Sequence, residues 1–137
     1  MTKNIGAALT AILAFAACSG VHQTVDVGGE WEVVQIDTMH ITPEKDVTPF
    51  FGFNARTGDF YGFTGCNRLT GRLEKSKLSE GHLDFSNVGC TRMLCHDALY
   101  ERPLLDAMQR VNKASVSGDT LRLTAPGGKA TIILKKR

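Results

Sequence analysis

The residues with the clearest chemical potential are thiols and an imidazole in the second half of the chain. Cys66 lies in a Gly-rich run, and Cys90, Cys95 and His96 follow it. Three thiols and an imidazole form a donor set that zinc accepts, and a thiol beside a histidine is the unit of a cysteine nucleophile. In an oxidising compartment the same thiols form disulfides. The pattern keeps a structural disulfide, a metal site and a thiol-based redox site open.

These cysteines allow three disulfide pairings. A bridge between Cys66 and Cys95 closes about 30 residues, for which the chain-entropy model gives ~3.6 kcal/mol. A bridge between Cys90 and Cys95 closes about six residues and gives ~2.2 kcal/mol. The shorter bridge also needs a turn to bring its two side chains together. Both considerations favour the longer bridge and leave Cys90 as the odd thiol.

The other motifs favour structure over catalysis. Residues 65–71 are Gly-punctuated but lack the Gly-Lys-Ser/Thr ending of a phosphate loop. The carboxylates are scattered, and no Ser/His/Asp constellation is indicated. We therefore expect no catalytic residue, no cofactor and no resident metal.

The composition fits one globular domain without nucleic-acid-binding character. The chain has 137 residues, of which 42% are hydrophobic and 22% charged, with a net charge of +2. Such a composition argues against disorder. Positive and negative charges are nearly balanced, which argues against a nucleic-acid partner.

The N-terminal segment predicts export and lipidation. Residues 5–17 are apolar and small, follow Lys3, and end directly before Cys18. This pattern predicts a lipoprotein signal peptide over residues 1–17, with a lipid on Cys18 as the membrane anchor. Ser19 after the cysteine favours the outer membrane. The alternative is an ordinary A-x-A cleavage site at Ala14-Phe15-Ala16, which would release an unanchored protein.

The elements expected beyond the signal peptide are a polar tether and one domain. The tether covers residues 18–28 and the domain residues 29–137. A change of parity after Val33 indicates either a bulge in the first strand or burial of both of its faces. The expected strands, from alternation and turn signals, are residues 30–37, 49–53, 60–63, 71–78 and 82–85. Residues 49–53 and 60–63 are aromatic and flank a Gly-containing turn at 54–59, which predicts a hairpin, and a last hairpin pairs 121–123 with 132–134.

One segment has helical spacing. Leu104, Ala107, Met108 and Val111 recur at i, i+3, i+4 and i+7, with Pro103 suited to the first turn. The order of elements predicts an α+β fold, mainly an antiparallel sheet with one packed helix.

The helix is expected to cover the aromatic strands. Most of these side chains then belong to the core, but a half-open sheet would leave some of them lining a groove for an acyl chain or a partner's helix. The candidate groove residues are Phe51, Phe53, Phe60, Phe63, Leu104 and Met108.

Two motifs give the sequence a family resemblance. The run Gly-Phe-Thr-Gly-Cys-Asn-Arg-Leu-Thr-Gly over residues 62–71, followed by Thr-x-Met-x-Cys over 91–95, resembles the META domain of HslJ-like envelope proteins. The resemblance implies a half-barrel with a helix packed across it, an envelope setting and a link to stress. It also places Cys66 and Cys95 on the family's cysteine pair, and it supplies no catalytic residues.

The sequence therefore predicts a non-enzymatic outer-membrane lipoprotein that faces the periplasm, anchored through Cys18. We expect it to bind an envelope protein or an apolar ligand in envelope maintenance or stress. The alternative is a thiol-based redox or metal-binding module that uses Cys66, Cys90, Cys95 and His96.

Overall fold

The computed structural model describes Gly20 and residues 23–137. The predicted signal peptide and its lipidation site Cys18 lie outside the described residues. In the described part of the chain the elements are β1 (Gly29–Ile36), β2 (Met39–His40), β3 (Phe50–Phe53), β4 (Asp59–Phe63), β5 (Arg68–Arg72), α1 (Lys75–Ser79), β6 (Gly89–Cys90), α2 (Glu101–Arg110), β7 (Lys113–Ser117), β8 (Thr120–Thr124) and β9 (Ala130–Lys136).

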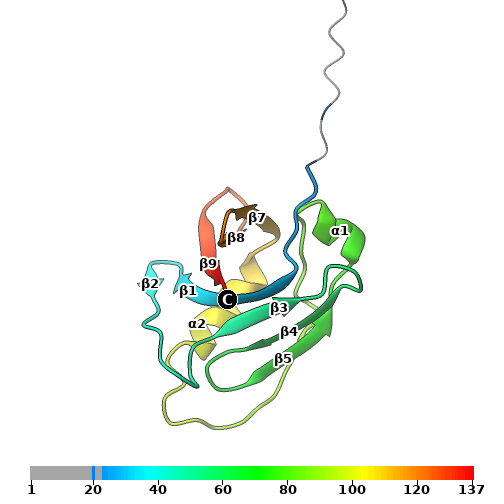
Figure 1. Ribbon diagram of the computed structural model, residues 1–137. Helices are drawn as coiled ribbons and strands as arrows, with labels where there is room; N and C mark the ends of the chain where they lie inside the picture. Colours follow the sequence, from blue (N-terminus) through cyan, green and yellow to red (C-terminus); the bar gives the residue numbers. More distant parts are fainter. Residues whose placement is uncertain (1–19, 21–22) are drawn as a thin grey trace, which may run out of the picture.

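The strands form one open antiparallel sheet. Its order is β6-β5-β4-β3-β1-β9-β8-β7, and β2 pairs with β1 off this path. The sheet curves around one side of α2, which contacts β1 and β9 (Figure 1). The predicted α+β class is confirmed. Neither helix of the described residues has the length and apolar character needed to cross a membrane.

β1 lies at the centre of the sheet, between β3 and β9. Trp31 and Val33 point to the buried face and are almost inaccessible to solvent. The pairing with β9 shifts register between Val33 and Gln35, which brings Ile36 to the buried face as well. The bulge predicted from the change of parity is confirmed.

β3 and β4 form the predicted aromatic hairpin. The inward-facing rings pack on one another, with 5.3 Å between the centroids of Phe51 and Phe60 and 5.1 Å between those of Phe60 and Phe85. These are the separations at which aromatic pairs attract beyond their simple burial. The rings fill the core beneath the hairpin.

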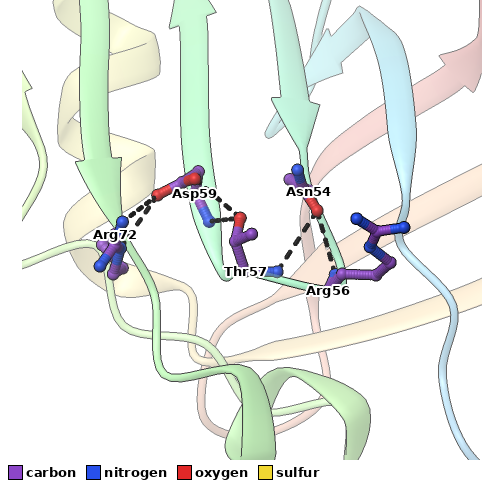
Figure 2. A network of polar contacts seen from close by, with 5 residues as sticks. All are labelled: Asn54, Arg56, Thr57, Asp59 and Arg72. Carbon is purple, nitrogen blue, oxygen red and sulfur yellow. Dashed lines mark hydrogen bonds and ion pairs between the residues drawn. The ribbon is translucent and has the colours of Figure 1, made fainter.

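The turn between β3 and β4 is held by its own side chains (Figure 2). Asn54 Oδ1 accepts hydrogen bonds from the backbone N–H groups of Arg56 and Thr57. Thr57 Oγ1 donates to Asp59 at 2.7 Å, and Arg72 Nε donates to the same carboxylate at 2.9 Å. The hydrogen bonds from Thr57 and then Arg72 hold the pKa of Asp59 below its ordinary value, so these contacts persist until the pH falls through that lowered pKa.

Helix α2 carries the predicted apolar face. Leu104, Ala107 and Met108 are buried, and Pro103 lies in the first turn as predicted. The helix begins at Glu101, ahead of the periodic residues, because proline is compatible with a first turn and an acidic side chain is favoured at a helix N-terminus.

Two of the predicted strands are wrong. Residues 71–78 contain only the end of β5, and Lys75–Ser79 form α1, in which Leu78 is the buried residue and Lys77 pairs with Glu74 at 3.2 Å. Residues 82–85 make a single bridge between His82 and Lys113. Ser86 N–H donates to the Asp84 side chain and turns the chain before a strand can continue.

Candidate binding groove

A disulfide closes the loop that precedes β5. Cys66 and Cys95 are bonded, with 5.9 Å between their Cα atoms, and they join the β4–β5 connection to the segment before α2. The predicted pairing is confirmed. Because the bond occupies two of the thiols of the alternative redox or metal site, that donor set is not available. Among the described residues no cluster of three or more His, Cys, Asp or Glu side chains is placed to hold a metal.

The buried amide of Asn67 organises the chain around this disulfide. Its Oδ1 accepts hydrogen bonds from the Met93 N–H at 2.6 Å and from Thr91 Oγ1 at 2.9 Å. Its Nδ2 donates to Glu101 Oε1 at 2.7 Å and to the Met93 carbonyl at 3.2 Å. One side chain thus links β5, the segment that contains Cys95 and the first turn of α2.

The segment held in this way presents apolar side chains to solvent. The exposed fractions are 60% for Met93, 104% for Leu94 and 68% for Leu99. In Figure 1 this segment lies at the end of the molecule opposite the point where the N-terminal segment leaves the domain. These exposed apolar residues therefore lie on a segment far from the N-terminal side of the domain.

A groove of about 850 Å³ opens between α2, β5 and the chain before β6. Its floor consists of side chains that belong to the core, including Leu69, Leu83 and Phe85. Its walls are only partly buried, which leaves their apolar surface accessible from outside. The side chains lining the groove are Leu69, Leu83, Asp84, Phe85, Ser86, Val88, Cys90, Leu105, Met108, Gln109, Arg110, Val111, Asn112 and Pro126.

Cys90 stands in this groove as the free thiol of the described residues. Burial raises the pKa of the Cys90 thiol, and the carboxylate of Glu101 raises it further. A thiol with a raised pKa carries little thiolate at neutral pH and is a poor nucleophile. The surroundings of Cys90 therefore favour a wall residue over a reactive one.

The predicted groove residues do not lie together in one groove. Phe51, Phe53, Phe60 and Leu104 are buried in the core, because the sheet curves closely enough around α2 to fill its inner face. Met108 alone of the six lines the groove beside α2.

Phe63 lies on the opposite face of the sheet. There it lines a second hollow of about 530 Å³ that also contains Glu32, Arg68 and Arg137. The Arg137 guanidinium stacks over the ring of Phe50, 4.3 Å from its centroid, and pairs with Glu32 at 3.7 Å. Besides this pair, four charged side chains line the hollow, those of Glu44, Lys45, Asp46 and Arg68. The groove beside α2 is therefore the stronger candidate for an apolar ligand.

The sequence does not predict most groove residues, because their positions depend on long-range packing. The alternation of Leu83 and Phe85 predicts a strand, whereas in the structure both side chains form the floor of the groove. Leu105 comes directly after Leu104 and so lies beside the apolar face of the predicted helix. An apolar residue at the edge of such a face is expected to be partly exposed and could have indicated a groove wall.

The fold and the groove define a class of small domain, an open antiparallel sheet curved around one helix, with a disulfide-closed loop at one end. The chain belongs to the META domain family, whose model matches residues 23–137. No curated protein matches the sequence significantly.

Solved structures share this fold at low sequence identity. A protein from Burkholderia xenovorans solved by NMR has a TM-score of 0.62 and 22% identity, over 80% of this chain and 81% of that one. Another NMR structure has a TM-score of 0.60 and 20% identity, over 78% and 87%. A DUF4847 family protein from Bacteroides vulgatus, solved by crystallography, has a TM-score of 0.54 and 15% identity, over 85% and 95%.

Proposed function

We propose that the protein is a non-catalytic, lipid-anchored domain of the bacterial envelope that binds an apolar ligand or an apolar segment of a partner protein. The groove beside α2 carries this proposal. Its volume of about 850 Å³ falls within the roughly 300–1,000 Å³ of small-molecule sites. Apolar walls with a few polar groups at the rim are also the usual composition of such sites.

The anchor is the lipid expected on Cys18. The apolar run before this cysteine supports it, and Ser19 supports an outer-membrane position facing the periplasm. The domain end of the tether is fixed, since Val25 N–H donates to the Ser79 carbonyl at 2.9 Å. The proposed role is in envelope maintenance or stress, on the strength of the family resemblance.

Replacing the anchor residue should change the location of the protein. Cys18→Ala is expected to move it from the membrane fraction to the soluble fraction or to block its maturation, because stable anchoring depends on the acyl chains. Fractionation of cells and mass spectrometry of the wild-type N-terminus measure this. Unchanged fractionation, together with a wild-type protein that carries no lipid, would contradict the anchor.

Binding in the groove is tested with an apolar fluorescent dye and the purified Cys18→Ala protein. Leu105→Asp is expected to weaken dye binding by about tenfold or more, because it puts a charge on the groove wall. Leu99→Asp is the matched control, since Leu99 is 68% exposed and lies outside the groove. Equal losses in both variants, with both folded by near-UV circular dichroism, would contradict a groove site.

A further inference from the structure

We infer that the groove accepts the acyl chain of a zwitterionic phospholipid, with the head group at the rim near Asp84 and Arg110. This inference rests on the proposed function and names the ligand of the same groove. It is carried by the composition of the groove walls, by the charges at the rim and by the place where the tether joins the domain.

The interior of the groove suits an apolar chain. Leu69, Val88 and Met108 line it together with Cys90 and Leu105. Among the described residues every buried side-chain nitrogen and oxygen already has a hydrogen-bond partner. The groove therefore holds no buried side-chain nitrogen or oxygen that only a polar ligand would satisfy.

The rim carries one charge of each sign. The backbone N–H of Ser86 donates to Asp84 and lowers the pKa of this carboxyl, which keeps it ionised. Arg110 donates to the Asp37 carboxylate from both of its terminal nitrogens, at 2.6 and 3.3 Å, and a guanidinium bound in this way keeps three of its five N–H donors. A head group with one ammonium and one phosphate matches this pair of charges, whereas an anionic head group would face the carboxylate of Asp84.

The tether brings one end of the groove close to the anchoring membrane. Val25 packs beside Gly81, where an added Cβ would lie 3.2 Å from Val25 Cγ2, and the groove lining begins two residues later at Leu83. The seven residue steps from Cys18 to Val25 span at most about 24 Å. A domain anchored in this way holds the Leu83 end of its groove within reach of membrane lipid.

Cys90 provides a direct reporter of occupancy, because it lines the groove and is the free thiol of the described residues. The experiment uses the full chain with Cys18→Ala and a monomeric zwitterionic probe, lysophosphatidylethanolamine below its micellar concentration. Alkylation of Cys90 at mildly alkaline pH is followed by intact-mass spectrometry. Saturating lipid is expected to slow it by about tenfold or more. Lysophosphatidylglycerol, which is anionic, should protect Cys90 less at the same concentration.

Variants distinguish binding of the acyl chain from recognition of the lipid head group. Leu105→Asp should abolish the protection, and Leu99→Asp should leave it intact. Asp84→Asn should weaken protection by the zwitterionic probe and so remove the difference between the two probes. Unchanged Cys90 alkylation at saturating lipid would overturn the inference, and so would equal protection by the anionic probe.

A further arm distinguishes this failure from failure of the proposed function. An amphipathic helical peptide that slows Cys90 alkylation where the lipid does not would retain a partner-binding groove and refute the lipid. If neither the lipid nor the peptide protected Cys90, and the wild-type protein bound no dye, both the lipid inference and the proposed function would be refuted.

Discussion

Removing the bond between Cys66 and Cys95 is expected to lower the melting temperature by on the order of 10–20 °C. The two cysteines are 29 residues apart in sequence, and the chain-entropy model gives about 3.6 kcal/mol for a loop of this size. That is a large share of the ~5–15 kcal/mol that stabilises a typical domain. The double variant Cys66→Ala/Cys95→Ala is preferred, because it leaves no partner for exchange with Cys90.

Cys90→Ala is the matched control. This thiol is partly buried against the core and forms no bond to another described residue, so its loss should shift the melting temperature far less. Scanning calorimetry compares the variants. A melting temperature that the double variant leaves unchanged, or an equal drop in Cys90→Ala, would show that the bridge does not stabilise the fold.

The second large effect is expected for Asn67→Ala, which should lower the free energy of unfolding by about 3 kcal/mol. Asn67 is 2% exposed, and its amide is the partner of Thr91, Met93 and Glu101. Truncation leaves the Met93 N–H and the Glu101 carboxylate, both partly buried, without their hydrogen-bond partner. A buried polar group without a partner lowers stability by more than a typical hydrogen bond adds to it. Urea denaturation measures the change in unfolding free energy.

Asn54→Ala is the control for the asparagine side chain itself. Asn54 also accepts two backbone hydrogen bonds, but in an exposed turn where water replaces it (Figure 2). We expect a loss of about 1 kcal/mol or less. Equal losses at the two positions would mean that burial of Asn67 contributes nothing beyond its local hydrogen bonds.

The sequence predicts the elements whose signal is local. The periodicity of Leu104, Ala107 and Met108 is set by one helical turn after another, and the aromatic hairpin by alternation around a Gly-containing turn. Both are confirmed. The bulge after Val33 is also confirmed, since a change of parity is a property of consecutive residues.

The groove could not be predicted in the same way. Leu69, Leu83 and Leu105 come from three distant segments, and their juxtaposition depends on how far the sheet curves around α2. The prediction of a strand at residues 71–78 failed because the local pattern is weak. Leu73 and Leu78 are five positions apart, a spacing that fits neither the strand nor the helix period. Charges of both signs around Lys75 favour a short helix instead.

Photo-crosslinking in intact cell envelopes tests the groove most directly. A photoreactive residue at Gln109, on the groove rim, is compared with one at Arg122, which is exposed on β8 and does not line the groove. The groove predicts an adduct at Gln109, peptide or lipid, that is absent at Arg122 and is lost when Leu105→Asp is added. No adduct at Gln109, or the same adduct at both positions, would contradict an apolar binding groove beside α2.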